Sequence, residues 1–108
     1  MEAKTCIDHC RSCEQICLET VTLCLEQGGR HADAKLINAL IDCVLICGSS
    51  AELMTRRSPL QSEHCRLCAE ACRLCAEACE AIGGEHMESC AAACRACEKC
   101  CAAMCAHC

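Results

Sequence analysis

The chain of 108 residues has no phenylalanine, tyrosine or tryptophan, one proline and five glycines. The bulky aliphatic residues that usually fill a core are concentrated in one segment, so smaller side chains must fill most of the interior. Cysteine, with nineteen residues, is the candidate, because a free thiol buries well as a small apolar group. We therefore expect one domain over residues 1–108, with a single modest and weakly packed core.

Three further absences narrow the class of protein. No segment alternates apolar and polar residues with period two, so a β-sheet is not expected. Acidic and basic residues are interleaved and the net charge is −5, which argues against a face that binds nucleic acid. Residues 1–6 show no secretory signal, and we expect no stretch apolar enough to span a membrane. These absences predict a protein that binds neither nucleic acid nor a membrane. They also predict that the protein is cytoplasmic, and in the cytoplasm thiols stay reduced.

The sequence is rich, by contrast, in cysteines at helical spacing. Residues 65–79 read CRLCAEACRLCAEAC, which is one seven-residue unit written twice and followed by a fifth cysteine. Steps of three and four residues place all five cysteines on one stripe of an α-helix. A helix in a bundle carries leucine at these positions. The stretch therefore predicts a helix whose inward face is made of thiols.

Similar stripes occur in three other segments. Gly28-Gly29, Ser58-Pro59 and Gly83-Gly84 separate the four, because glycine ends helices and a serine followed by proline begins them. The predicted helices cover residues 4–27, 33–57, 59–82 and 85–107, with Ser58 as the cap of the third. Short connections between four helices predict an all-α fold, an antiparallel up-down-up-down four-helix bundle with cysteines lining the interior.

Thiols at this spacing can chelate metal ions. Cysteines three or four residues apart on a helix have Cβ atoms about 5–6 Å apart, so a pair such as Cys6 and Cys10 can hold one ion between its sulfurs. Soft thiolates select Cu(I), zinc or iron–sulfur clusters. We predict that all nineteen cysteines are metal ligands: Cys6, Cys10, Cys13, Cys17, Cys24, Cys43, Cys47, Cys65, Cys68, Cys72, Cys75, Cys79, Cys90, Cys94, Cys97, Cys100, Cys101, Cys105 and Cys108.

Charge favours Cu(I) among these metals. One Cu(I) per thiolate leaves a neutral core once each thiol has lost its proton. Zinc held by four thiolates would leave negative charge at every site, no lysine or arginine lies on the stripes to offset it, and buried unpaired charge costs several kcal/mol per ion. The thioethers of Met54, Met87 and Met104 on the stripes are also good Cu(I) ligands. We therefore predict that each chain binds many Cu(I) ions.

These features resemble the cytosolic branch of the bacterial copper storage proteins. The resemblance rests on the CxxxC and CxxC stripes of all four segments, on the cysteine-poor second helix and on Ser58-Pro59 ahead of the third, and it covers essentially the whole chain. It implies a four-helix bundle that stores many Cu(I) ions per subunit, a homotetramer, and entry of metal at one end of the bundle past histidine or methionine. A copper-delivering chaperone is the partner expected for such a protein.

The two ends of the predicted bundle carry different residues. One end has soft ligands and little bulk: Cys6, His9, Met54, His64, Cys65, Met104, Cys105, His107 and Cys108. The other end gathers Cys24, Leu36, Cys79, Ile82, Met87 and Cys90, with His31 and His86 nearby. We predict entry at the first end, with His9, Met54, His64, Met104 and His107 as candidate entrance ligands. The alternative is a solvated surface role for each histidine and core filling for each methionine.

The second segment has only Cys43 and Cys47 and is apolar almost all round. A bundle helix has one inward face, so the surplus apolar face predicts contact with other copies of the chain. Deeper burial within the monomer is the alternative.

Other functions fit less well. A zinc buffer with thiolate ligands is one alternative, and an iron–sulfur electron carrier is another, since the spacing from Cys65 to Cys75 resembles that of ferredoxins. Cluster loops are irregular, however, whereas this run is helical. An odd number of cysteines on helical faces argues against a disulfide scaffold, and the lack of Cys-x-Cys argues against a metallothionein. No phosphate loop or distinct Cys/His pair is present, so we do not expect an enzyme.

Overall fold

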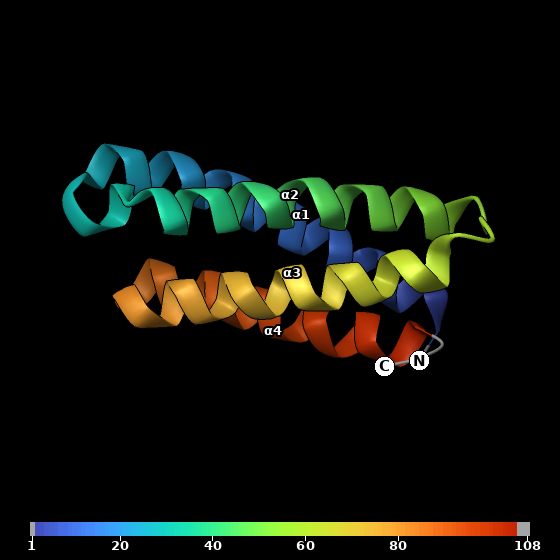
Figure 1. Cartoon of the computed structure of the whole chain (residues 1–108). Coiled ribbons are helices and arrows are strands. Elements are labelled where there is room, and N and C mark those ends of the chain that lie inside the picture. The colour runs from blue at the N-terminus through green and yellow to red at the C-terminus, as the bar shows by residue number, and fades with distance from the viewer. Residues whose placement is uncertain (1, 106–108) are drawn as a thin grey trace.

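In a computed structural model, which describes residues 2–105, the chain forms four long helices and one short 3₁₀-helix. These are α1 (Ala3–Gln27), η1 (Gly29–Ala32), α2 (Ala34–Thr55), α3 (Gln61–Ile82) and α4 (Glu85–Met104). Each long helix runs antiparallel to the next, and α4 returns to pack beside α1 (Figure 1). The bundle measures 42 × 19 × 19 Å. The predicted all-α antiparallel four-helix fold is confirmed.

The bundle has two distinct ends (Figure 1). We call one the loop end, where η1 and the α3–α4 turn lie. We call the other the terminal end, where α1 begins, α4 ends, and the α2–α3 turn lies. At the loop end, α1 and α3 stop at Gly28 (φ 71°) and Gly83 (φ 77°), whose N–H groups donate to the carbonyls of Cys24 and Cys79. Glycine suits these positions because it adopts positive φ without steric cost.

The third helix begins two residues later than predicted. It starts at Gln61, and the Ser58 hydroxyl accepts a hydrogen bond from the Leu60 N–H at 3.1 Å instead of capping the helix. The cause lies in the end of α2. The N–H of Ser58 donates to the Leu53 carbonyl at 2.9 Å, with Arg57 at φ 55°, which is the Schellman arrangement. Residues 56–58 therefore close α2, and one more turn is needed before α3.

The core consists mainly of cysteine side chains. Leu40 is the largest fully buried side chain in the described part of the chain, and cysteines follow it. Leu36, Met54 and Met87 are also buried. The stripes of the four helices thus meet along the bundle axis, and a cysteine-lined interior is confirmed. Helix α4 ends at Met104, and residues 106 and 107 of its predicted range lie outside the described residues.

One expectation about the membrane is wrong. Helix α2 is long and apolar enough to cross a bilayer by length and composition, with a mean hydropathy of 1.6 over its best 18-residue window, of which 39% is buried in the bundle. Both the inward stripe and the outer flanks of α2 are apolar, and mean hydropathy sums over both faces. A core helix meets the same criterion. The finding alone therefore does not make α2 a membrane segment.

Candidate metal site

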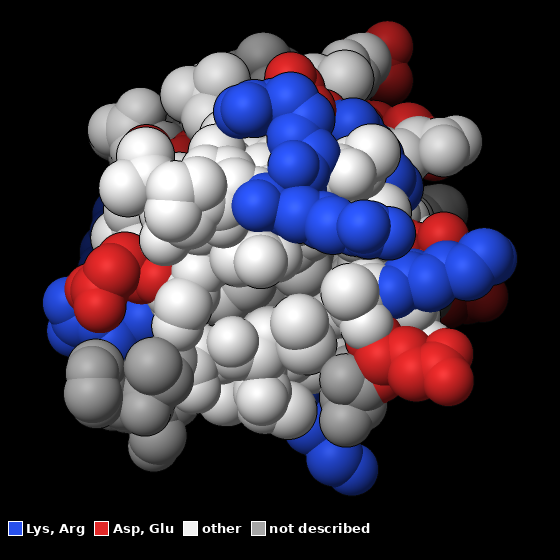
Figure 2. Space-filling view, turned by 90° about the vertical axis from the view of Figure 1, so that its right-hand side faces the viewer, with Lys and Arg blue, Asp and Glu red and all other residues white. Residues whose placement is uncertain are grey.

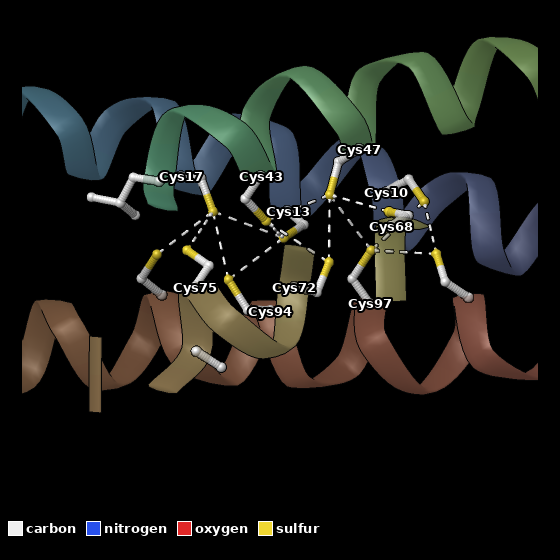
Figure 3. Packing of buried hydrophobic residues seen from close by; sticks show 14 of the residues in the cluster. Cys10, Cys13, Cys17, Cys43, Cys47, Cys68, Cys72, Cys75, Cys94 and Cys97 are labelled. Atoms are coloured by element: carbon white, nitrogen blue, oxygen red, sulfur yellow. Dashed lines mark hydrogen bonds between the residues drawn. The ribbon is translucent and has the colours of Figure 1, made fainter. Parts of the chain in front are cut away.

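Thiols from all four helices converge on the axis of the bundle (Figure 3). Every cysteine from Cys6 to Cys101 is buried and free. The closest contacts mostly join different helices: Cys13 Sγ lies 3.6 Å from Cys43 Sγ, and Cys47 Sγ lies 3.6 Å from Cys72 Sγ. Sulfurs of one helix lie at similar distances, with Cys43 and Cys47 at 3.7 Å and Cys13 and Cys17 at 3.9 Å. The candidate ligand sets therefore combine sulfurs of one helix with facing sulfurs of other helices.

The sulfurs form five groups whose members all lie within 4.8 Å of one another. Consecutive groups share one or two cysteines: Cys101, Cys97, Cys13, Cys17 and Cys94 each belong to two of them. A shared thiolate can bridge two ions, so the column suits linked sites. The groups are Cys6/Cys100/Cys101, Cys10/Cys68/Cys97/Cys101, Cys13/Cys47/Cys72/Cys97, Cys13/Cys17/Cys43/Cys94 and Cys17/Cys75/Cys90/Cys94.

In each four-thiol group, the sulfurs converge from three or four helices. Tetrahedral zinc coordination needs such convergence, so geometry alone would admit zinc. Zinc would still leave a net negative charge, because no lysine or arginine is buried among residues 2–105.

Several predicted ligands lie outside the five groups. Cys65 and Cys79 are buried beside the column, and Cys24 lies apart from it with its Sγ 3.7 Å from the Met87 thioether. Cys100, by contrast, belongs to one of the five groups although it lies beside the predicted stripe, and its Sγ is 2.9 Å from Cys6 Sγ. Cys105 is disulfide-bonded and partly exposed at the end of α4, which differs from the free thiol expected there. Cys108 lies outside the described residues.

The candidate entrance ligands at the terminal end are placed differently from one another. Met54 is buried, whereas His9 and Met104 are partly exposed. His64 is also partly exposed, and its Nε2 lies 2.6 Å from the Ser49 hydroxyl. His107 lies outside the described residues.

Figure 2 shows the terminal end, with lysine and arginine side chains gathered over one side of it. The exposed Arg56 and Arg57 belong to the α2–α3 turn at this end.

The thiols share protons within the column. Hydrogen bonds raise the pKa of Cys17, and the bond with Cys13 contributes most. The same bond lowers the pKa of Cys13. Burial raises the pKa of both thiols, but for Cys13 the hydrogen bonds outweigh burial and its pKa is lowered overall. Burial is the largest cause of the raised pKa of Cys24. Metal must therefore displace protons to form thiolates here.

The sequence matches a known family over almost its whole length. The family model described as copper storage protein covers residues 1–106. The chain belongs to the copper storage protein family.

Solved structures agree with this family assignment. The Cu(I)-bound copper storage protein BsCsp3 is similar with a TM-score of 0.92 and 32% identity, covering 98% of this chain and 100% of that chain. The apo form of copper storage protein 3 from Bacillus subtilis gives 0.89 and 32% over 97% and 100%. The Nmul_A1745 protein from Nitrosospira multiformis gives 0.90 and 37% over 94% and 93%. No curated protein matches the chain.

In this member of the copper storage family, the sequence predicts the cysteines as ligands but does not predict which thiols form a group. Five cysteines are shared between groups: Cys13, Cys17, Cys94, Cys97 and Cys101. This sharing follows from helix rotation and axial offset, which no single stripe specifies. The contact of Met87 with Cys24 was also missed. Its signal was present, since Met87 lies on the stripe of its helix.

Proposed function

We propose that this chain stores Cu(I), with many ions per chain held by cysteine thiolates inside the bundle. The observation that carries the proposal is the column of five thiol groups joined by shared cysteines. A protein that binds a single structural ion needs one such group, whereas a column of such groups can hold many ions. The family assignment supports the proposal, as does the similarity to BsCsp3, whose solved structure contains Cu(I).

Charge selects Cu(I) over zinc in this setting. Each thiol that binds Cu(I) releases one proton, so the loaded site gains no net charge. Zinc bound to one of the four-thiol groups would leave a net negative charge with no buried cation beside it, and uncompensated charge in the interior costs several kcal/mol. The alternatives of a zinc buffer and an iron–sulfur carrier are therefore less favourable.

We further propose that the protein is not an enzyme, that it acts in the cytoplasm, and that it binds neither nucleic acid nor a membrane. A copper-delivering chaperone would transfer Cu(I) at the terminal end, past His9, Met54, His64, Met104 and His107. The exposed Arg56 and Arg57 there favour a partner whose docking face is acidic, because opposite charges speed association.

A homotetramer is also part of the proposal. The outer face of α2 exposes Ile41 by 40% and Leu45 by 65%. Beside it, a cavity of about 570 Å³ runs between α2 and α3, with Leu67 and Leu74 in its wall. A continuous apolar surface of this kind is typical of contacts between subunits. The same contact would cover the apolar side of α2.

The test is an anaerobic titration of the reduced protein with Cu(I) against a competing chelator, with zinc in parallel. We expect uptake of at least as many Cu(I) ions per chain as the five thiol groups, and preference for Cu(I) when both metals are offered. Uptake of no more than a couple of Cu(I) ions, or preference for zinc, would contradict the proposal.

A further inference from the structure

We propose that the loop end carries a separate Cu(I) site, formed by the Cys24 thiolate and the Met87 thioether and reached through a cavity lined by His31 and His86. The choice of Cu(I) as the ion rests on the proposed storage function. The site itself rests on its own geometry. It gives the bundle a metal-binding position at the end opposite the predicted entrance.

The two sulfurs are placed as a ligand pair. Cys24 Sγ and Met87 Sδ lie 3.7 Å apart, and the two residues are only 1% and 3% exposed. Cys24 is in the last turn of α1 and Met87 in the first turn of α4, so the fold itself brings them together. Neither residue belongs to the five thiol groups.

On α1 and α2, residues without a thiol lie on the stripe between this pair and the column. Thr20 takes the stripe position between Cys17 and Cys24, and its hydroxyl donates to the Ile16 carbonyl at 2.7 Å instead of facing a metal site. On α2, the stripe continues toward the loop end with the buried Leu40 and Leu36 instead of cysteine. On α1 and α2, therefore, Cys24 supplies the only stripe thiol in this part of the bundle.

A cavity at the surface borders the pair. A cavity of about 350 Å³ is lined by Cys24 and Met87 and also by His31 and His86. His31 is partly exposed and His86 exposed, so an incoming ion can meet imidazole before it reaches sulfur. Imidazole nitrogen is a suitable copper ligand. The route does not pass through the column of thiols.

The ligand set is matched to a soft monovalent ion. When Cu(I) binds, the Cys24 thiol loses its proton to solvent and its sulfur forms a bond to copper, while the neutral Met87 sulfur donates a lone pair. One negative and one positive charge then cancel. Zinc gains little from a thioether, and bound to a single thiolate it would leave the ion and its two sulfurs with a net charge of +1.

The test follows the methionine methyl groups by NMR. Full-length reduced protein with ¹³C-methyl methionine is titrated anaerobically with chelator-buffered Cu(I), and Met87→Leu assigns the signal of Met87. We expect this signal to shift on loading and the shift to disappear in Cys24→Ala. Met87→Leu should bind one Cu(I) fewer than the wild type. The matched control Met54→Leu, a buried methionine at the terminal end, should leave the Met87 shift intact.

The role of the cavity is tested separately. In the double variant His31→Gln and His86→Gln, the Met87 shift should appear several-fold more slowly at a fixed concentration of free Cu(I) than in the wild type. His9→Gln at the terminal end is the control and should not change this rate. An unchanged rate in the double variant would overturn the part assigned to the histidines.

The outcomes separate this site from the storage function. If the chelator competition shows normal Cu(I) uptake while the Met87 signal stays still, the loop-end site is wrong and storage stands. If the protein takes up no Cu(I), the storage function and the loop-end site both fall. Helix content by circular dichroism shows whether Cys24→Ala is folded, and the Met87→Leu stoichiometry decides the matter if it is not.

Discussion

Two neighbouring serines of α2 differ in the hydrogen bonding of their hydroxyl groups. Ser49 donates its hydroxyl to the carbonyls of Leu45 and Ile46 and contacts His64. Ser50 is fully buried on the stripe, and its hydroxyl has no hydrogen-bond partner in the part of the chain that the structure describes. A buried hydroxyl without a partner costs about 1–3 kcal/mol. Ser50 is therefore a weak point of the metal-free protein.

Replacing Ser50 by alanine should stabilise the metal-free protein. The change removes the unpaired hydroxyl, so we expect the free energy of unfolding to rise by about 1–2 kcal/mol in urea. Ser49→Ala is the matched control and should lower it, since the hydrogen bonds of that hydroxyl are lost. Equal losses in the two variants would mean that a thiol already satisfies the Ser50 hydroxyl.

At the scale of the helices, the end of α2 contains a strained residue. Arg57 has φ 55°, a conformation that costs a non-glycine residue about 1–2 kcal/mol. The Schellman hydrogen bonds of the turn hold it there.

Arg57→Gly should therefore raise the free energy of unfolding of the metal-free protein by about 1 kcal/mol. Arg56→Gly removes the same charge at the preceding residue, which has φ −85°, and it should be neutral or destabilising because glycine only adds freedom to the unfolded chain. Urea unfolding of both variants measures the difference. If both variants change stability alike, the effect comes from charge and not from the backbone.

The facing thiol stripes should make the metal-free bundle sensitive to alkaline pH. Burial raises the pKa of Cys24, and hydrogen bonds with Cys75 and Cys90, with burial added, raise the pKa of Cys79. An unfolded thiol has a pKa of about 8.5, so above that pH these two thiols hold more protons in the folded state than in the unfolded state. Their contribution to stability then falls as pH rises.

We expect the free energy of unfolding of the reduced, metal-free protein to be level below pH 8 and to fall between about pH 8 and pH 10. The Cu(I)-loaded protein is the control. Its thiols have already lost their protons, so its stability should change much less over this range. A metal-free protein that gains stability with rising pH would contradict the raised pKa values.

At the scale of the whole molecule, loading and folding should be coupled. The four-thiol groups draw their members from three or four helices, and the Cys6/Cys100/Cys101 group joins α1 to α4, so bound ions crosslink elements that a small-residue core holds only weakly. A ligand that binds only the folded state stabilises it in proportion to the logarithm of its concentration. The melting temperature should therefore rise steadily with the number of Cu(I) ions bound. Thermal melts at stepwise loading, without oxygen, measure it, and a flat response would count against crosslinking.

The outer face of α2 makes a second prediction at this scale. Leu45→Glu places a charge in the proposed contact between subunits and should lower the native mass toward that of the monomer. Leu18→Glu on α1, where leucine is 58% exposed, is a matched control and should leave the mass unchanged. Light scattering after size exclusion measures both variants. An unchanged mass for Leu45→Glu would place the interface elsewhere.

The sequence by itself determined which residues face inward. The spacing of cysteines fixes the stripe of each helix, because side chains three and four residues apart share a face. Glycine pairs at residues 28–29 and 83–84 mark two of the turns, and the four stripes together predict the bundle. The start of α3 was missed by two residues, since the capping hydrogen bonds of Ser58 depend on how α2 ends.

Only the tertiary structure decided which thiols meet. The axial offset and rotation of the helices place Cys13 and Cys17 in two groups each, and leave Cys24 outside all five. These quantities depend on the packing of side chains between helices, and a stripe looks the same whatever lies across from it. For the same reason, the sequence places Cys24 and Met87 near one end of the bundle, but it does not predict their contact at 3.7 Å. That contact depends on how α1 packs against α4.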